Sequence, residues 1–431
     1  MSSWKKVSVI GLGYIGLPTA AVIAKNGVKV IGVDVNPHAV GTINQGKIHI
    51  VEPGLEAIVE DVVGQGLLTA TLIPEEADAF LIAVQTPFKE GHQPDLDYIE
   101  AAAKAIAPVL SKSNLIILES TSPVGATEKL ARWLAHERPD LTFPHSHGEQ
   151  SDIRVAYCPE RVLPGRVLEE LVNNDRVIGG LTKKCSALAA SLYKTFVSAE
   201  CILTNSRTAE MCKLTENSFR DVNIAFANEL SILCKSLDID VWELISLANR
   251  HPRVNILKPG PGVGGHCIAV DPWFIIAAEP ENSKIIHAAR TVNDSKPEWV
   301  TKQVMFAVEE YARNHQEVKM NEVVIGCFGL SFKPDIDDLR ESPAIKIAHR
   351  LCHAHNGKVM VVEPHISEMP QILESVATLG EADEVFKQAH VIVYLVAHSL
   401  FVDQSFTTDS EKIVIDACGL LKIKEQHANF T

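Results

Sequence analysis

The sequence predicts an α/β protein in which two Rossmann-like parallel-sheet domains are joined by a central helical domain with a long helix. Three observations indicate this architecture. Short apolar runs alternate with helical patterns through the first part of the chain, helical pattern alone fills the middle, and the alternation restarts near the end. At 431 residues the chain is also too long for one hydrophobic core. We expect domains over residues 1–203, 204–317 and 318–431.

The first domain contains several short apolar runs separated by helical patterns. This arrangement is typical of parallel strands joined by helices. The predicted strands are Val7–Ile10, Val28–Val33, Ala79–Val84, Leu115–Leu118, Arg154–Tyr157 and Cys201–Leu203.

The middle of the chain is predicted to be helical. Asn205 or Ser206 is suited to cap a long helix over Arg207–Ser236, because a short polar side chain accepts from the first unpaired N–H groups. More helical pattern continues to about His315, and the Pro/Gly segment Lys258–Gly265 interrupts it.

The last domain resumes the alternation after a polar stretch, Arg313–Glu322, that is typical of a linker. We expect a second, smaller parallel sheet there. Its predicted strands are Val323–Phe328, Lys358–Val362, Val391–Val396 and Ile413–Ile415.

Composition argues against several classes of function. No apolar run approaches the ~20 residues that a membrane helix needs, and the amino-terminal residues lead directly into a predicted strand. The nine cysteines are odd in number and scattered without a C-x-x-C pair, which favours reduced thiols. A formal net charge of −14 opposes binding to nucleic-acid phosphates. We therefore expect a cytoplasmic protein with no signal peptide and no nucleic-acid or membrane partner.

A glycine-rich turn follows the first predicted strand. Gly11, Gly13 and Gly16, with Tyr14 and Ile15 between them, form a G-x-G-x-x-G pattern that opens a helix. The first glycine permits a tight turn, the second lets a pyrophosphate approach the backbone, and the third lets helix and strand pack closely. The N–H groups at the helix start attract phosphate. The turn therefore predicts a dinucleotide site.

The rest of this site is predicted from the ends of later strands. The second strand ends in Asp34, whose carboxylate suits both ribose hydroxyls and repels a 2′-phosphate, so NAD is favoured over NADP. Thr86 and Thr121 follow further strands at the carboxyl edge of the sheet, and Thr127 begins the next helix. The alternative is a structural glycine turn that binds no ligand.

A second group of residues combines a thiol, an amine, an amide and a carboxylate. Lys213 and Asn217 lie one helical turn apart, and Arg220 continues that stripe. Cys267 ends a glycine-dense loop, and Asp271 follows four residues later. Each alone has an ordinary alternative, such as a solvated lysine, an inert cysteine or a turn acid. Together they indicate oxidation through a covalent sulfur adduct.

Further candidates flank this group. Glu160 follows another strand end and is a second possible base. His251, Arg253 and Lys258 add charge close to the glycine-dense loop in the sequence. Cations or loop N–H groups near a thiol raise its thiolate fraction, which matters because an ordinary thiol has a pKa near ~8.5.

These residues resemble the UDP-glucose/GDP-mannose dehydrogenase family over essentially the whole chain. The shared motifs are the GLGYIGLP start, Glu119-Ser120-Thr121, Pro159-Glu160-Arg161, Ala209-Glu210-x-x-Lys213-x-x-x-Asn217, GVGGHC and Gly329-Leu330-Ser331-Phe332-Lys333 with Asp338-Leu339-Arg340.

Two segments are similar to one branch of that family. GPGVGGHCIAVDPWF and NRHPRVN look like the branch that acts on UDP-N-acetyl-D-mannosamine. The UDP-glucose branch carries a lysine where this chain has Val270, which argues against a glucose substrate. Gln85 stands where relatives usually have proline, and we expect only a local backbone effect.

The resemblance implies a four-electron oxidation. NAD would take hydride from the C6 alcohol of the sugar to give an aldehyde, and Cys267 would add to that aldehyde. A second NAD would take hydride from the resulting thiohemiacetal to leave a thioester, which water would hydrolyse. Lys213 and Asn217 would hold the developing oxyanion, and Lys213 would also handle the proton. The residues that would position or activate water are Asp271, Glu160 and Thr121.

The resemblance also implies how the ligands are held. Arg340 would reach the NAD, the carboxyl-terminal domain would hold UDP, and the long helix would form the core of a homodimer. The product would be UDP-N-acetyl-D-mannosaminuronate for a bacterial surface polysaccharide such as enterobacterial common antigen. The expected contacts to the nucleotide sugar are Arg161, Val162, Lys213, Asn217, Arg220, His251, Arg253, Gly264, Phe332 and Lys333.

Several alternatives stay open from the sequence. The same chemistry on UDP-GlcNAc or UDP-glucose is one, and a two-electron hydroxyacid-type dehydrogenase with an idle Cys267 is another. A non-catalytic NAD-binding sensor is a third. We expect no metal, because one of two histidine-rich groups lies in a loop with no cysteine spacing. The other is explained by an exposed polar face or by favourable charge near a helix C-terminus. These groups are His145, His147, Glu149 and Asp152, and His349, Cys352, His353 and His355.

Overall fold

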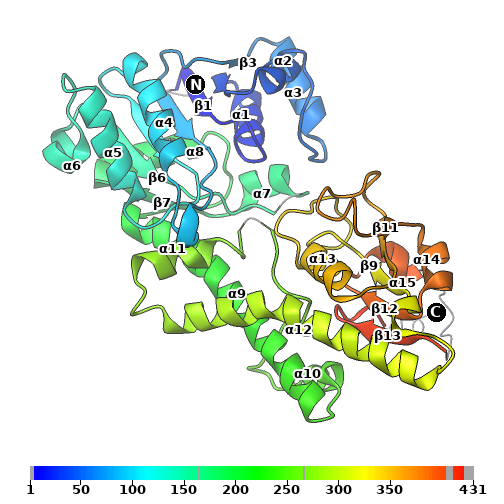
Figure 1. Ribbon diagram of the computed structural model, residues 1–431. Helices are drawn as coiled ribbons and strands as arrows, with labels where there is room; N and C mark the ends of the chain where they lie inside the picture. The colour runs from blue at the N-terminus through cyan, green and yellow to red at the C-terminus, as the bar shows by residue number, and fades with distance from the viewer. Residues whose placement is uncertain (1–3, 164, 266, 404–410, 422–431) are drawn as a thin grey trace. The chain divides into compact units, whose positions relative to one another are not determined.

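The computed structural model describes residues 4–163, 165–265, 267–403 and 411–421 (Figure 1). Contacts divide these residues into two compact units. The first unit contains the residues up to Glu216 together with Trp273–Ala278, and the second contains Asn217–Pro272 and the residues from Glu279 onward. Each unit has its own sheet, one with eight strands and one with five, so the predicted fold class is confirmed.

The eight-stranded sheet of the first unit has the order β3-β2-β1-β4-β5-β6-β7-β8. Neighbouring strands are parallel except for the antiparallel pair β6 and β7. The order reverses between β1 and β4, which is where open α/β sheets bind ligands. The strands are β1 Lys6–Ile10, β2 Lys29–Val33, β3 Leu68–Thr71, β4 Ala79–Ile82, β5 Leu115–Leu118, β6 Arg154–Tyr157, β7 Arg176–Gly180 and β8 Cys201–Asn205.

Each strand predicted for this part of the chain is confirmed, but β3 and β7 were not predicted. Strand β3 reads LTAT and lies at the edge of the sheet, where alternate residues are exposed and no apolar run is needed. Strand β7 reads RVIGG, so an arginine and two glycines shorten its apolar run. Both strands therefore lack the pattern that identified the others.

Helices cover both faces of this sheet with separate apolar clusters. One cluster joins Val7 and Val9 of β1 to residues of α1, α3, α7 and α8. The other joins Ile10 and Ile82 to residues of α4 and α5. These helices are α1 Gly16–Lys25, α2 Pro37–Asn44, α3 Leu55–Gly64, α4 Asp97–Ile106, α5 Ala126–Glu137, α6 Pro144–His147, α7 Val167–Asn173 and α8 Lys183–Tyr193.

The central part of the chain is helical, as predicted. It contains α9 Ser206–Ser236, α10 Val241–Ala248, α11 Asp271–Ala278 and α12 Lys284–Asn314. The Asn205 Oδ1 atom accepts a hydrogen bond from the Thr208 N–H at 2.9 Å, so Asn205 caps α9. The Pro/Gly segment Lys258–Gly265 lies outside the helices, as its composition requires.

A buried polar network joins α9 to α12 within the second unit. Asp221 accepts from Arg290 Nη1 at 2.7 Å and from Asn293 Nδ2 at 2.8 Å. Asn293 in turn accepts from Asn228 Nδ2 at 2.9 Å. The Oδ1 atom of Asn228 accepts the N–H of Gly260 at 2.8 Å. Since losing one partner of a buried ion pair costs several kcal/mol, this network fixes the start of the glycine-dense loop against both helices.

The five-stranded sheet of the second unit has the order β11-β10-β9-β12-β13, and its strands are all parallel. The predicted strands are confirmed, whereas the two-residue β11 was not predicted. Helices α12 and α13 cover one face, and α14 and α15 the other. The elements are β9 Ile325–Phe328, α13 Pro343–Ala354, β10 Val359–Val362, β11 Thr378–Leu379, α14 Ala382–Gln388, β12 Val391–Tyr394, α15 Ser399–Asp403 and β13 Ile413–Asp416.

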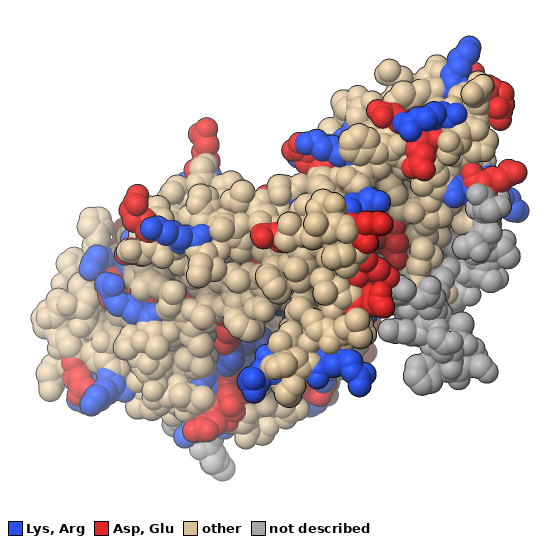
Figure 2. All heavy atoms as spheres, turned by 90° about the horizontal axis from the view of Figure 1, so that it is seen from below, with Lys and Arg blue, Asp and Glu red and all other residues tan. Residues whose placement is uncertain are grey.

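Among the described residues, no helix combines the length and apolar character needed to cross a membrane. On the face seen in Figure 2, Lys and Arg are interspersed with Asp and Glu. Charge of both signs is therefore distributed in small groups over this face.

Candidate active site

The glycine turn after β1 has the geometry that a dinucleotide requires. Gly11 adopts a φ of 91° and donates its N–H to the Val33 carbonyl at 2.8 Å. A Cβ atom on Gly16 would lie 1.8 Å from the Gly11 oxygen, so no side chain fits there. Around Gly13 no described heavy atom lies within 4 Å of the Cβ position, and Tyr14 is exposed. The turn thus leaves open backbone at the start of α1, which suits a pyrophosphate.

Asp34 is held beside this turn by backbone donors. Its Oδ2 atom accepts the Leu12 N–H at 2.8 Å, and its Oδ1 atom accepts the Asn36 N–H at 2.9 Å. These contacts place a half-buried carboxylate at the end of β2 and next to the glycine turn. The donors and the acid together fit the ribose and phosphates of NAD.

The three predicted threonines lie at or beyond the ends of β4 and β5. The Thr86 hydroxyl donates to the Thr121 carbonyl at 2.6 Å, which ties the two loops together. Thr127 is buried, and both its N–H and its hydroxyl donate to Glu210 Oε1, at 2.8 and 2.6 Å. Glu210 also accepts the Gly125 N–H at 2.6 Å, so this α9 residue caps α5. Burial raises the pKa of Glu210.

Glu160 is part of a buried ion pair in the first unit. Its Oε2 atom accepts from Arg176 Nη1 at 2.8 Å, and its Oε1 atom accepts the Arg161 N–H at 2.6 Å. Arg176 also donates to the Leu171 carbonyl at 2.9 Å. Both side chains are buried, so the pair fixes the orientation of the Glu160 carboxylate.

A second acid, Glu119, lies in the same buried cluster. Its Oε1 atom accepts from the Tyr193 hydroxyl at 2.5 Å. Burial, and next the charge of Glu160, raise the pKa of Glu119 to about 7. Burial likewise raises the pKa of Cys158 to about 12, which keeps this thiol protonated at neutral pH. In the sequence Glu119 stands out only as part of the Glu119-Ser120-Thr121 motif, and its pairing with Tyr193 carries no sequence signal.

Arg161 and Val162 follow Glu160. The Arg161 guanidinium forms an ion pair with Glu216 of α9, with 2.7 Å between Nη2 and Oε1. Val162 is half-buried against the apolar cluster that contains α1. Both residues therefore lie close to the Glu160 cluster.

In the second unit, the structure brings Asn217, Cys267 and Asp271 together. The Asp271 N–H donates to the Cys267 carbonyl at 2.8 Å, so these two residues are one turn apart at the start of α11. Asn217 Nδ2 donates to Asp271 Oδ2 at 2.5 Å. Asp271 is buried and Cys267 is exposed. Lys213 is half-buried and lies on α9 four residues before Asn217.

The glycine-dense loop packs against the segment that follows β9. A Cβ atom on Gly264 would lie 2.7 Å from the Phe332 Cβ and 2.8 Å from the Glu341 oxygen. The Gly265 N–H donates to the Arg340 carbonyl at 3.2 Å. Only glycine allows this approach, which brings two predicted substrate residues, Gly264 and Phe332, into contact. His266 of the GVGGHC motif lies outside the described residues.

The remaining predicted residues have polar side chains and are exposed. Arg340 pairs with Asp338, with 2.6 Å between Nη2 and Oδ2. Lys333 directly follows Phe332. The Arg253 N–H donates to His251 Nδ1 at 3.3 Å. Arg220, on α9, is also exposed.

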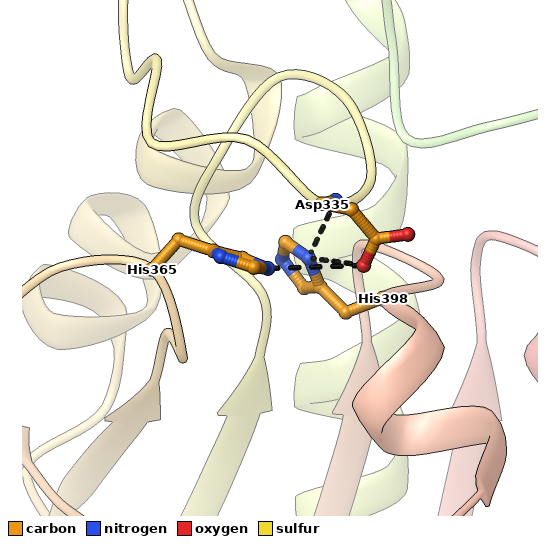
Figure 3. A group of neighbouring side chains, drawn as sticks. All are labelled: Asp335, His365 and His398. Carbon is orange, nitrogen blue, oxygen red and sulfur yellow. Dashed lines mark hydrogen bonds and ion pairs between the residues drawn. The ribbon is translucent and has the colours of Figure 1, made fainter. Parts of the chain in front are cut away.

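One group in the described residues brings possible metal ligands together, and it was not predicted from the sequence. Asp335, His365 and His398 converge in the second unit (Figure 3). Asp335 Oδ1 lies 3.7 Å from His365 Nε2 and 3.7 Å from His398 Nδ1. However, His398 Nδ1 already accepts the Asp335 N–H at 3.0 Å, so its lone pair is not directed at a shared ion.

Comparison with known proteins identifies relatives across nearly the whole chain. The UDP-glucose/GDP-mannose dehydrogenase family matches through its NAD binding domain over residues 5–197, its central domain over 207–295 and its UDP binding domain over 326–423. The chain is 60% identical to UDP-N-acetyl-D-mannosamine dehydrogenase of Escherichia coli, over 97% of this chain and 99% of that protein.

Two further relatives differ from each other in the sugar that their names state, and one of them names the same sugar as the Escherichia coli protein. NDP-N-acetyl-D-galactosaminuronic acid dehydrogenase of Ralstonia nicotianae is 59% identical, over 98% of this chain and 97% of that protein. The solved structure of UDP-D-ManNAc dehydrogenase from Pyrococcus horikoshii is 36% identical and has a TM-score of 0.84, covering 96% of each chain. Overall identity therefore identifies the chemistry better than the sugar.

The raised pKa of Glu119 predicts a stability that falls as pH rises. Between its ordinary value of 4.5 and about 7, unfolding ionises Glu119 while the folded protein keeps it protonated. Glu119→Gln removes this difference. We expect the free energy of unfolding of the variant, relative to wild type, to increase by up to about 3 kcal/mol from pH 5 to pH 8.

Denaturation at several pH values in that interval measures this difference. Ser191→Ala, which changes an exposed side chain of α8 that does not titrate, is the control in the same unit and should give a pH-independent difference. If the difference in unfolding free energy between Glu119→Gln and wild type were also independent of pH, the raised pKa assigned to Glu119 would be contradicted.

Proposed function

We propose that this chain, which belongs to the UDP-glucose/GDP-mannose dehydrogenase family, oxidises the C6 alcohol of UDP-N-acetyl-D-mannosamine to a carboxylate. Family membership makes the chain an NAD-dependent dehydrogenase of nucleotide sugars and removes the non-catalytic alternative. The particular sugar and the route through a thioester are the proposal.

The observation that carries the proposed route is the group of Asn217, Cys267 and Asp271. An exposed thiol lies one helical turn from a buried carboxylate, and an amide holds that carboxylate at 2.5 Å. A thiol that adds to an aldehyde must be accessible, and a carboxylate that directs water must keep a fixed orientation. The arrangement meets both requirements.

The first oxidation converts the alcohol to an aldehyde. When bound beside the glycine turn and Asp34, NAD would supply the acceptor for the hydride from C6. Lys213 takes the hydroxyl proton, and Lys213 and Asn217 donate to the oxygen as its charge develops. A donor placed at a developing oxyanion lowers a barrier by about 3 kcal/mol, so these two residues carry much of the proposed rate enhancement.

The second oxidation requires the sulfur. The Cys267 thiolate forms a bond to the aldehyde carbon, which gives a thiohemiacetal with its oxygen held by Lys213 and Asn217. Removal of a second hydride, for which bound NAD would supply the acceptor, would leave a thioester. Water then attacks the carbonyl carbon, the C–S bond breaks, and the carboxylate and the thiol are released. Four electrons leave the sugar as two hydrides.

Hydrolysis depends on residues that orient water. Asp271 accepts from Asn217 and is buried, which supports its role in positioning the attacking water. Glu160 is fixed by Arg176 and by the Arg161 N–H, and a carboxylate with two such contacts keeps lone pairs for a water. Thr121 is assigned to ordering that water.

The ligand contacts follow the same assignment. The contact between Gly264 and Phe332 supports a nucleotide-sugar site built on the glycine-dense loop and the segment after β9. The fit of the glycine turn and Asp34 to NAD supports the cofactor assignment, with Tyr14, Ile15, Thr86, Thr127 and Arg340 as further contacts. We retain domains over residues 1–203, 204–317 and 318–431. The other proposed sugar contacts are Arg161, Val162, Arg220, His251, Arg253 and Lys333.

The homodimer is proposed from an apolar stripe on α9. Phe219, Phe226 and Leu233 of α9 are spaced by seven residues, so they lie along one side of the helix, and Leu237 directly follows it. Their exposed fractions are 69%, 54%, 47% and 66%. A stripe of this size is covered in most stable proteins, and a second copy of α9 would cover it.

We place the enzyme in the cytoplasm, where its product would supply an acidic sugar for a surface polysaccharide such as enterobacterial common antigen. The absence of a C-x-x-C pair and the scattered thiols support a reducing compartment. The sugar composition of the surface polysaccharide in a strain that lacks this chain tests the assignment, since an unchanged content of aminouronic acid would refute it.

Cys267→Ala is expected to abolish acid formation because no thioester can form. The rate should fall on the order of a thousandfold or more, while wild type releases two NADH per acid. NADH absorbance and product analysis measure both quantities. Cys201→Ala, which removes a half-buried thiol, is the matched control and should keep full activity. Unchanged turnover in Cys267→Ala, or one NADH per product, would instead support a two-electron dehydrogenase.

A panel of nucleotide sugars tests the substrate. We expect kcat/KM for UDP-N-acetyl-D-mannosamine to exceed that for UDP-glucose by at least about a hundredfold, because a site built for the amide loses hydrogen bonds with glucose. NADH release with UDP-N-acetyl-D-glucosamine, UDP-N-acetyl-D-galactosamine and GDP-mannose completes the comparison. A higher kcat/KM for any of these sugars would replace the proposed substrate.

Phe226→Asp is expected to weaken the dimer, because it buries a charge in the middle of the apolar stripe. Sedimentation at micromolar concentration should show a monomer for the variant and a dimer for wild type. Phe306→Asp, on the exposed surface of α12, is the control and should stay dimeric. Two dimeric variants would show that the stripe is not the interface.

A further inference from the structure

His398 occupies a buried position between β12 and α15, outside the residues assigned so far. Its side chain is fully buried. Its Nδ1 atom accepts the Asp335 N–H at 3.0 Å (Figure 3), and its Nε2 atom lies 3.0 Å from Glu363 Oε2. A backbone N–H only donates, so Nδ1 is the acceptor, and this assigns the proton to Nε2. His398 therefore donates to Glu363 and accepts from Asp335.

Glu363 follows β10 and holds the beginning of the segment after β9. Its Oε2 atom accepts the N–H groups of Leu330 at 2.7 Å and Ser331 at 2.9 Å. Its Oε1 atom accepts the His365 N–H at 3.1 Å. Although burial opposes ionisation, hydrogen bonds from His398 and from the Leu330 N–H hold the pKa of Glu363 below its ordinary value. A buried carboxylate with these donors is a fixed anchor.

Asp335 ends the held stretch in a conformation that favours glycine. Its φ is 60°, so the surrounding contacts must keep it there. The Asp335 N–H donates to His398, and the carboxylate accepts from the Ser399 N–H at 2.9 Å and the Ser399 hydroxyl at 2.6 Å. The segment Leu330–Asp335 is thus held at both ends by one buried pair, Glu363 and His398.

Between these ends lies Phe332, which contacts the glycine-dense loop. The Cβ position of Gly264 lies 2.7 Å from Phe332 Cβ, and that of Gly265 lies 2.9 Å from the Phe332 ring. Cys267 lies two residues beyond Gly265 at the end of the same loop. A displacement of Leu330–Asp335 would therefore be transmitted to the loop that carries the thiol.

We infer that His398, through the hydrogen bond that it accepts from the Asp335 N–H, is a positioning residue for the nucleotide-sugar site. It holds Leu330–Asp335 so that Phe332 and Lys333 meet the substrate and the glycine-dense loop keeps its place. This inference rests on the proposed function, because the substrate contacts are those assigned there. His398 touches no reacting atom in this scheme. Its effect is on substrate binding through the segment that it holds.

A metal at this position is the competing interpretation. A shared ion would need the Nδ1 lone pair of His398, and the Asp335 N–H occupies it. Positioning by hydrogen bonds therefore predicts that EDTA leaves KM for the sugar unchanged and that added Zn²⁺ does not lower it. A KM that rises with EDTA and recovers with Zn²⁺ would overturn the inference in favour of a metal site.

Two substitutions separate the bonds of His398. In His398→Asn the Oδ1 atom replaces Nδ1 and keeps an acceptor for the Asp335 N–H. In His398→Gln the amide replaces Nε2 and keeps only the contact to Glu363. We expect KM for UDP-N-acetyl-D-mannosamine to rise about tenfold in His398→Gln and to stay within about threefold of wild type in His398→Asn. KM for NAD should not change.

Protection of Cys267 gives a readout that does not depend on turnover. Iodoacetamide labels an exposed thiol, and bound UDP-N-acetyl-D-mannosamine should slow that labelling. The sugar concentration for half-protection is expected to rise about tenfold in His398→Gln without NAD present. Thermal unfolding confirms that each variant is folded. If a His398 variant does not fold, Ser399→Ala provides a second test. It removes only the exposed Ser399 hydroxyl that donates to the Asp335 carboxylate, and it should raise KM about threefold.

The outcomes distinguish this inference from the proposed function. If KM and half-protection stay at wild-type values in His398→Gln and Ser399→Ala while Cys267→Ala is inactive, the positioning role is wrong and the thioester route stands. If Cys267→Ala still forms acid, the proposed route is wrong whatever the His398 variants show. Equal rises in His398→Asn and His398→Gln would also contradict the specific role given to the Asp335 contact.

Discussion

The hydrogen bond between Asn217 and Asp271 is the interaction on which the proposed chemistry depends. It joins the long helix α9 to the first residue of α11, with 2.5 Å between Nδ2 and Oδ2. Because the Asp271 N–H also binds the Cys267 carbonyl, one contact sets the carboxylate and the turn that carries the thiol. Without it, a buried acid would lose a donor, and the turn that carries the thiol would lose this contact with α9.

Buried ion pairs hold polar segments in place at more than one position in this protein. Asp221 with Arg290, and Glu160 with Arg176, are ion pairs with both side chains buried. Desolvation makes such groups costly unless each one is paired, so the surrounding backbone has few alternative arrangements. Each pair lies beside a segment that the proposed reaction uses, which is why the pairs matter for function.

Much of the fold could be predicted from the sequence, because buried parallel strands are apolar runs and the helices between them have a different period. The missed strands are those whose sequences break that pattern, such as β3 with its exposed alternate residues. The proximity of Cys267 to Asp271 follows from their spacing of four residues, whereas Asn217 meets Asp271 across 54 residues and was grouped with them from chemistry and resemblance. By contrast, Glu119 meets Tyr193 across 74 residues, and His398 meets Glu363 across 35. Such partners are set by the sheet order, which no local pattern contains.

Mass analysis of the quenched Asp271→Asn enzyme tests the central claim most directly. The variant is mixed with UDP-N-acetyl-D-mannosamine and excess NAD, stopped in acid and digested. If Asp271 directs the water that releases the product, the acyl-enzyme should accumulate, and the peptide that contains Cys267 should gain the mass of the nucleotide-sugar acyl group. Oxidised sugar with no added mass on that peptide would contradict the account.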